Sequence, residues 1–298
     1  MEFFQAIANM SGDSLAQHLA NGISLGSLYA LIAIGYTMVY GILLMINFAH
    51  GDIVMMACYF AFFGITVFHI PWYITFVGVI IATAILGVVI ERTAYRPLRD
   101  APKNSVLISA IGASFLLENL ANYLFSGRPM RFPNIELLSQ NISIGGIQIQ
   151  AICLVIPVIT IISLVVLLHI VNHTKTGMAM RAVSKDYEIA RVISITFIIG
   201  SSLAAIGAIM WGIRYPGITP MMGVMPGLKC FIAAVIGGIG NIKGAVLGGF
   251  ILGLGEILIV AFFPQLSGYR DAFAFIVLIV ILFYKPTGLL GEKTTEKV

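Results

Sequence analysis

Long apolar runs, each about as long as a bilayer is thick, constrain the fold of this chain more than any other feature. A membrane-spanning helix needs roughly 20 predominantly apolar residues, because its backbone polar groups must be satisfied internally. We predict about nine such helices, over 19–45, 48–70, 72–90, 105–125, 149–171, 192–213, 219–239, 244–263 and 269–284. No alternation of polar and apolar residues runs along the chain, so a β-barrel is not expected. The sequence therefore predicts an all-α polytopic membrane protein.

The composition excludes several classes of protein. Charged residues make up 10% of the chain and hydrophobic residues 59%, whereas an average soluble domain is about 25% charged. A soluble enzyme, a disordered chain and a nucleic-acid-binding module are therefore not expected. The net charge of +4 is concentrated in a few short loops, which is typical of membrane topology signals.

The basic loops predict an orientation. Lys and Arg gather in 91–104, in 172–191 and at the C-terminal end. The positive-inside rule places these segments in the cytoplasm, and the N-terminus and the loop 126–148 outside. No linker is visible, so we expect one transmembrane domain over 1–298. The run 237–249 is interpreted as a cytoplasmic turn between two helices, or alternatively as a break in one discontinuous helix.

Polar residues inside the apolar runs are the candidates for function. An Asp or Lys at a helix centre costs roughly 2.5–3.5 kcal/mol on insertion scales, so such residues usually face a cavity or the interior of the bundle. We predict that four of them line a path for a solute: Asn47, His50, Asp52 and Glu118. For all four, the alternative is interhelical hydrogen bonding, or a position at the membrane interface rather than at mid-depth. For Lys229 and Glu256 the sequence favours neither role.

Motifs for chemistry are weak in this chain. There is no phosphate-binding G-x-x-x-x-G-K-[ST] run. The G-x-S-x-G match at 22–26 lies in an apolar helix rather than at a strand-to-helix turn. His169 and His173 share a helix face without a third ligand. We predict no catalytic residue, no metal and no cofactor, and the chain is not expected to be an enzyme.

Five stretches give the chain a resemblance to a known family. They lie at 21–56, 91–99 (ERTAYRPLR), 176–191 (TGMAMRAVSKDYEIAR), 233–253 and 269–291, and the most specific runs within them are INFAHGD at 46–52 and GGIGNIKGAVLGG at 237–249. In this order they resemble the permease subunits of ABC importers for branched-chain amino acids, most closely the H-type subunits of the high-affinity leucine/isoleucine/valine systems. The resemblance implies a bacterial inner-membrane location, a second homologous permease, two cytoplasmic ATPase subunits and an extracytoplasmic amino-acid-binding protein.

The resemblance also gives the loop 172–191 a role. Composition alone favours an ordinary positive-inside loop containing a short helix of mixed charge. The family pattern implies that it is the helix that couples the permease to an ATPase, through Gly177, Arg181, Ala182, Asp186, Glu188 and Ala190. One departure is visible, because relatives carry a Gly-Ile step after the Ala-Arg pair, whereas Arg191 here runs directly into Val192.

The function implied by the resemblance is ATP-driven import by alternating access, with this chain forming half of the path for Leu, Ile or Val. Close relatives carry urea or short amides, so these remain alternative substrates. A self-sufficient secondary transporter is a less favoured alternative, and it would transport without ATP.

Overall fold

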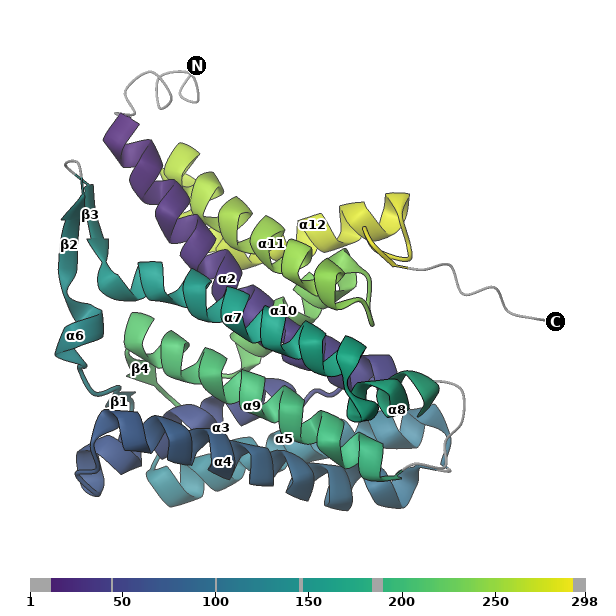
Figure 1. Ribbon diagram of the computed structural model, residues 1–298. Helices are drawn as coiled ribbons and strands as arrows, with labels where there is room; N and C mark the ends of the chain where they lie inside the picture. Colours follow the sequence, from purple (N-terminus) through teal and green to yellow (C-terminus); the bar gives the residue numbers. More distant parts are fainter. Residues whose placement is uncertain (1–11, 44, 100, 145–146, 184–189, 292–298) are drawn as a thin grey trace.

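The computed structural model of the 298-residue chain describes residues 12–43, 45–99, 101–144, 147–183 and 190–291. Figure 1 shows a bundle of long helices with short strands at one end. The α-helices are α2 (Gly12–Leu43), α3 (His50–Phe62), α4 (Trp72–Ile90), α5 (Lys103–Phe125), α6 (Glu136–Ser139), α7 (Ala151–His173), α8 (Lys175–Val183), α9 (Ala190–Arg214), α10 (Val224–Gly237), α11 (Ile242–Phe262) and α12 (Arg270–Tyr284). The π and 3-10 turns are η1 (Phe63–Val67), η2 (Glu91–Tyr95), η3 (Arg96–Leu98) and η4 (Pro264–Tyr269).

Eight segments of the described chain are long and apolar enough to cross a membrane. The all-α polytopic class is thereby confirmed. The predicted ninth span, 219–239, is the exception, because only α10 forms within it and has 14 residues. A two-residue strand and a turn come before α10, so its run of apolar residues is not helical throughout.

Helix α2 lies at the centre of the bundle. It packs against α7, α9, α10 and α11, and its most apolar stretch is 94% buried. Gly249 and Gly253 of α11 face Ala30 and Gly26 of α2. Small residues at these positions, spaced by four along α11, let the two helices approach closely.

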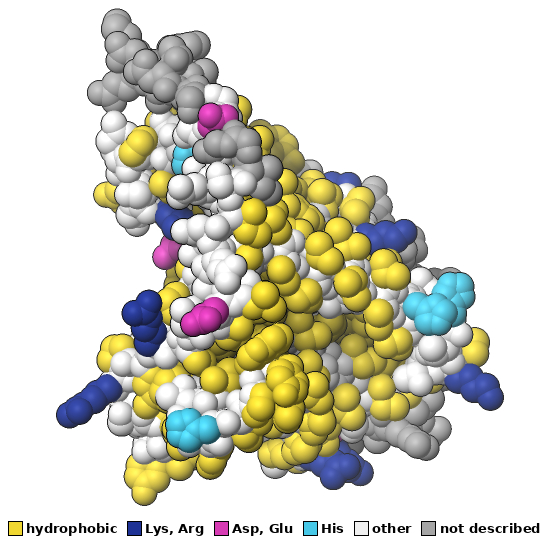
Figure 2. Space-filling view, turned by 60° about the vertical axis from the view of Figure 1, so that its left-hand side comes forward, with side chains coloured by type: hydrophobic (Ala, Val, Ile, Leu, Met, Phe, Trp, Pro, Cys, Tyr) yellow, Lys and Arg dark blue, Asp and Glu magenta, His cyan; other side chains and the backbone are white. Residues whose placement is uncertain are grey.

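The outer helices carry the surface that faces lipid. Exposed aliphatic side chains lie along α4, α7 and α12, among them Ile81, Val158 and Ile279. Hydrophobic side chains cover much of the face in Figure 2, with Lys and Arg near its margins. A soluble protein does not leave so large an apolar surface in water, whereas a bilayer accommodates it.

The two ends of the bundle are formed by different parts of the chain. The α4–α5 connection, α8 and the end of α12 lie at one end, on the right of Figure 1. The start of α2 and the short strands lie at the other end. Strand β1 (Met130–Arg131) pairs antiparallel with β4 (Gly217–Ile218), with Met130 opposite Ile218. Strand β2 (Asn141–Ile144) forms a hairpin with β3 (Ile147–Gln150). The segments predicted to face the cytoplasm therefore share one end.

Within the run 237–249, residues 238–241 form a turn between α10 and α11. Helix α10 ends at Gly237, and Gly238 follows with φ +107°, a conformation that favours glycine. Asn241 then caps α11, because its side chain accepts a hydrogen bond from Gly244 N at 3.1 Å. Asn241 Nδ2 also donates to Leu290 O at 2.8 Å, which ties the turn to the end of the described chain.

Candidate functional site

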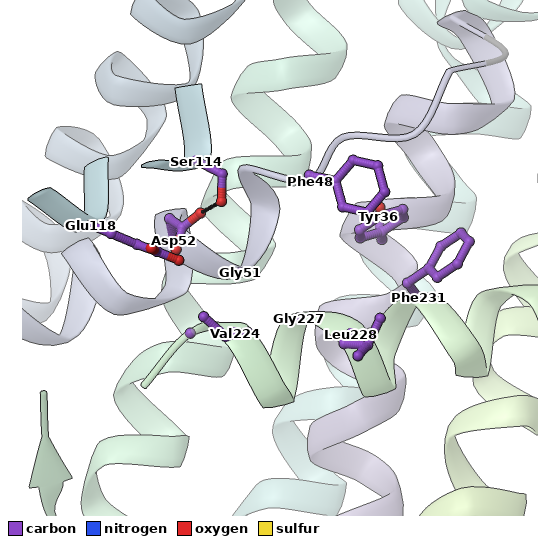
Figure 3. A pocket seen from close by; sticks show the side chains of 11 residues that line it. Tyr36, Phe48, Gly51, Asp52, Ser114, Glu118, Val224, Gly227, Leu228 and Phe231 are labelled. Carbon is purple, nitrogen blue, oxygen red and sulfur yellow. Dashed lines mark hydrogen bonds between the residues drawn. The ribbon is translucent and has the colours of Figure 1, made fainter. Parts of the chain in front are cut away.

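A small cavity lies between α3, α5 and α10, together with Tyr36 of α2 and Phe48 before α3 (Figure 3). Its volume is about 130 Å³, close to that of an engineered cavity of roughly 150 Å³ that binds benzene. We call it the acidic pocket. Its lining residues are Tyr36, Phe48, Gly51, Asp52, Ser114, Glu118, Gly223, Val224, Gly227, Leu228 and Phe231.

Two carboxylates form one side of the acidic pocket. Asp52 is 2% exposed, and its Oδ2 accepts a hydrogen bond from Ser114 Oγ. Glu118 lies four residues after Ser114 on α5, so both occupy the same helix face. Figure 3 shows the carboxylates of Asp52 and Glu118 turned toward one another. No Lys, Arg or His lines the pocket, and neither acid forms an ion pair with a described residue. Such a site favours a cationic ligand.

Apolar side chains form the other side of the acidic pocket. The rings of Tyr36 and Phe231 lie 5.5 Å apart between centroids, and Phe48 lies beside Tyr36. Val224 and Leu228 of α10, one helical turn apart, complete this wall. An aliphatic group placed here is removed from water, which contributes roughly 25 cal/mol for each Å² buried. The pocket thus offers an acidic end and an apolar end to one small ligand.

Glycines bring α3 and α10 close enough to form the pocket. A Cβ at Gly227 would lie 2.7 Å from Gly51 Cα, and Gly223 contacts the same turn of α3. A side chain at any of these positions would push the two helices apart. We call this contact the glycine seam, and it places Asp52 of α3 across from Val224 of α10.

Asn47 and His50, which we predicted to line the path with Asp52, do not line the acidic pocket. Asn47 Oδ1 accepts a hydrogen bond from Tyr95 Oη at 2.9 Å. His50 Nε2 donates to Ile32 O at 3.2 Å. Residues two apart on a helix differ in direction by about 200°, so His50 and Asp52 point to opposite sides of α3. The two polar side chains hold the start of α3 against α2 and η2.

A second cavity of about 450 Å³ adjoins the pocket and shares Glu118 with it. Asn119 and Asn122 of α5 line this cavity, with Thr219 and Met221 from the segment after β4. Ser114, Glu118 and Asn122 are spaced by four, so a polar stripe follows one face of α5. The stripe leads from the acidic pocket toward the end of the bundle that carries β1 and β4.

Lys229 and Glu256, for which the sequence favoured no role, form a second buried charged region. Lys229 Nζ lies 2.9 Å from Glu256 Oε1 and 2.7 Å from Asp271 Oδ1. Tyr29 Oη donates to Glu256 Oε2 at 3.1 Å, and Arg270 Nη2 lies 4.0 Å from the same oxygen. These five residues, which we call the charge cluster, join α2, α10, α11 and α12. Because two acids meet two bases, the cluster is balanced.

The predicted coupling segment begins with α8. Thr174 separates α7 from α8, and its Oγ1 accepts a hydrogen bond from Gly177 N at 3.1 Å. A Cβ at Gly177 would overlap the carbonyl oxygens of Ile170 and Val171, so glycine lets α8 fold back on the end of α7. Arg181 and Ala182 lie in the last turn of α8, and Ala190 begins α9. Asp186 and Glu188 lie outside the described residues.

The sequence motifs considered for catalysis or metal binding do not form a catalytic or metal site among the described residues. Ser24 of the G-x-S-x-G match lies buried within α2, and its hydroxyl has no hydrogen-bond partner among the described residues. His169 and His173 lie with ring centroids 5.3 Å apart. No group of three potential metal ligands gathers in the described part of the chain.

Several residues that line the acidic pocket were not predicted from the sequence. Ser114 carried a usable signal, because it precedes Glu118 by four residues and therefore shares its helix face. The apolar wall carried none, since Phe231 and Leu228 belong to helical runs in which nearly every residue is apolar. Periodicity does not separate a pocket wall from a core in such helices.

Comparison with known proteins identifies the family. The model of the branched-chain amino acid transport system permease component matches residues 18–282. The chain belongs to this family. It is 40% identical over 304 residues to the high-affinity branched-chain amino acid transport system permease protein LivH of Escherichia coli strain K12, covering 95% of this chain and 97% of LivH. The identity to BraD of Pseudomonas aeruginosa is 40% over 303 residues, with the same coverage.

A more distant relative is the probable branched-chain amino acid transport permease protein LivH of Methanocaldococcus jannaschii. It is 24% identical over 290 residues, which cover 92% of this chain and 91% of that protein. No solved structure matches this chain significantly. The family is one of transport permeases rather than enzymes. Together with the eight spans, it makes the chain a multi-pass protein of the bacterial inner membrane.

Proposed function

We propose that this chain is a permease subunit of an ABC importer and forms half of a translocation path for leucine, isoleucine and valine. The family and the 40% identity to LivH and BraD support this proposal. The observation that carries it is the acidic pocket, in which carboxylates without a cation partner face a wall suited to an aliphatic side chain. A secondary transporter is disfavoured by the family, and urea or a short amide would leave the apolar wall without a partner.

In this proposal Asp52 and Glu118 contact the substrate, whereas Asn47 and His50 position the start of α3 that carries Asp52. A second homologous permease supplies the facing half of the path. An extracytoplasmic binding protein delivers the amino acid from the side of the second cavity. ATP binding by two cytoplasmic ATPases switches the path between outward-facing and inward-facing states, and this chain itself makes or breaks no covalent bond.

The coupling segment would transmit the ATPase motion. We propose that α8 docks on an ATPase through Gly177, Arg181, Ala182, Asp186, Glu188 and Ala190. The close contact of Gly177 with the end of α7 supports this role, because a push on α8 would pass directly to α7. Helix α7 packs on α2, which supplies Tyr36 to the acidic pocket.

Purification in a mild detergent, followed by uptake in proteoliposomes, tests the proposed function. We expect ATPases to copurify and leucine uptake to require ATP and the binding protein. Copurified ATPases with uptake of urea or an amide instead of leucine would keep the transporter class and change the substrate. Transport by this chain alone without ATP would overturn the proposal.

Variants of the coupling segment test the docking role separately. Arg181→Ala and Glu188→Ala are expected to lower ATP-driven uptake and the yield of copurified ATPases without preventing membrane insertion. Arg128→Ala, in the loop predicted to lie on the opposite side, is the matched control and should leave ATPase copurification unchanged. Full transport after deletion of 176–189 would show that ATPase coupling does not pass through this segment.

A further inference from the structure

Asp52 differs from the other buried carboxylates of the described chain. Three Asp or Glu side chains are buried there, at 1–2% exposure: Asp52, Glu91 and Glu256. Glu256 pairs with Lys229 at 2.9 Å, and Glu91 lies 3.7 Å from Arg99. Asp52 has the Ser114 hydroxyl and the neighbouring acid Glu118, but no cation. A buried charge without a partner is costly, so a cationic ligand would complete this site and none of the others.

The acidic end suits a primary ammonium group in particular. An ammonium carries three N–H donors, and each carboxylate offers acceptors on two oxygens. Ser114 engages one oxygen of Asp52, which leaves its other oxygen and the Glu118 carboxylate to receive a ligand. The apolar wall lies across the same small cavity, whose volume is about 130 Å³. A cation that bears a short aliphatic group would use both ends, whereas a bare metal ion would use only one.

The pocket holds no cationic group for the carboxylate of an amino acid. None of its lining side chains is cationic. The start of α10 does not replace one, because Val224 N and Gly227 N already donate to Met221 O and Gly223 O, and Pro226 has no N–H. The pocket therefore complements the ammonium and aliphatic ends of an amino acid, and a cationic partner for the carboxylate would have to come from outside the pocket.

We infer that the acidic pocket is a subsite for a primary alkylammonium group, held by Asp52 and Glu118 with its aliphatic chain against Val224, Leu228 and Phe231. The inference rests on the proposed function for the identity of the physiological substrate, a branched-chain amino acid. It requires no ATPase activity, so the binding step is measurable apart from transport.

A cysteine reporter in the pocket makes the test direct. Val224 lines the pocket and is 40% exposed, so V224C is expected to react with a maleimide. The natural residues Cys58, Cys153 and Cys230 are all buried and give little background. The full chain, with the subunits that copurify with it, is placed in nanodiscs and labelled in the presence of 3-methylbutylamine. The matched ligand is 3-methylbutan-1-ol, which lacks the ammonium, and 4-methylpentanoate carries the opposite charge.

We expect the amine to protect V224C at concentrations about tenfold lower than the alcohol requires, since each tenfold step corresponds to about 1.4 kcal/mol. The carboxylate should not protect. Adding D52N or E118Q should raise the half-protecting amine concentration about tenfold and leave protection by the alcohol unchanged. Asp13→Asn, in the exposed first turn of α2, is the control for loss of a carboxylate and should change neither value.

Three results would overturn the inference: equal protection by the amine and the alcohol, protection by sodium chloride alone, or amine protection that survives both D52N and E118Q. F48C, elsewhere on the apolar side of the pocket, serves as a second reporter if V224C does not fold. Loss of amine protection with intact ATP-driven leucine uptake would refute the subsite and keep the proposed function. Intact amine protection without ATP-dependent leucine uptake would support the subsite and refute the proposed function.

Discussion

The acidic pocket and the charge cluster contain the same kind of residue in two different settings. Asp52 and Glu256 are both acids in apolar helices, and both are nearly fully buried. Glu256 is surrounded by Lys229, Arg270 and the Tyr29 hydroxyl, whereas Asp52 faces a cavity and a second acid. An intramembrane charge thus indicates structure when its partner is internal, and indicates a ligand site when the partner is missing.

Helix α10 connects the two regions. Leu228 faces the acidic pocket, and Lys229, the next residue, lies in the charge cluster. Consecutive residues on a helix point about 100° apart, so one short helix contributes to both. Variants of this helix and its neighbours separate effects on stability from effects on transport.

The largest expected effect is on stability, from Lys229→Met. This change leaves Glu256 buried without its main partner, and breaking a buried ion pair in this way costs about 3–5 kcal/mol. We expect a corresponding loss in the apparent free energy of unfolding in detergent, with low membrane yield. The double variant Lys229→Met/Glu256→Gln removes both charges and keeps an acceptor for Tyr29, so it should recover most of that loss. Unchanged stability of the single variant would show that the cluster does not hold the helices together.

The next effect is on transport, from Glu118→Gln in the acidic pocket. Hydrogen bonds to charged groups contribute about 1.5–3 kcal/mol, so ATP-driven leucine uptake at low substrate should fall about 10–100-fold. Because Glu118 has no internal ion pair among the described residues, the free energy of unfolding should change by less than about 0.5 kcal/mol. If Glu118→Gln lowers the free energy of unfolding but leaves uptake by the folded protein unchanged, Glu118 has a structural role and not a transport role.

Gly227→Ala tests the glycine seam on which the pocket depends. The added methyl would lie 2.7 Å from Gly51 Cα, which is backbone and cannot rotate away. Such overpacking costs about 1–3 kcal/mol, and both stability and leucine uptake should fall. Gly112→Ala in α5 is the control, since its Cβ meets open space and alanine favours helix by up to about 1 kcal/mol. Equal results for the two variants would show that the seam is not tightly packed.

The smallest effect is expected from Ser114→Ala. The hydroxyl donates to Asp52, and a hydrogen bond to a charged group contributes about 1.5–3 kcal/mol, but Ser114 only positions the carboxylate, which stays in place to hold the substrate. Leucine uptake should fall by less than about tenfold, with the charge of the pocket preserved. Ser202→Ala, whose hydroxyl donates only to Ile198 O in its own helix among the described contacts, is the control. A fall in uptake as large as that of Glu118→Gln would assign the main contact to the serine rather than to the acids.

Much of the fold followed from local sequence. Runs of apolar residues set most helices within a few residues of the predicted bounds, since backbone groups in a bilayer require it. Helix α2 is an exception, because it begins at Gly12 rather than at 19. The predicted span 219–239 was too long, because α10 begins only at Val224, after a turn that follows the pairing of β4 with β1. The pairing of β4 with β1 joins segments almost ninety residues apart, so no local sequence pattern predicts it.

The site divides in the same way. The sequence by itself determined which ionisable groups enter the apolar helices, and their cost there marked Asp52 and Glu118 as informative. Tertiary packing decided the rest. Packing points His50 away from the acidic pocket and pairs Glu256 with Lys229, whereas Asp52 has no cationic partner among the described residues. The role of a buried charge depends on its neighbours in space. Those of Asp52 come from α5 and α10, which meet α3 through the Ser114 hydrogen bond and the glycine seam.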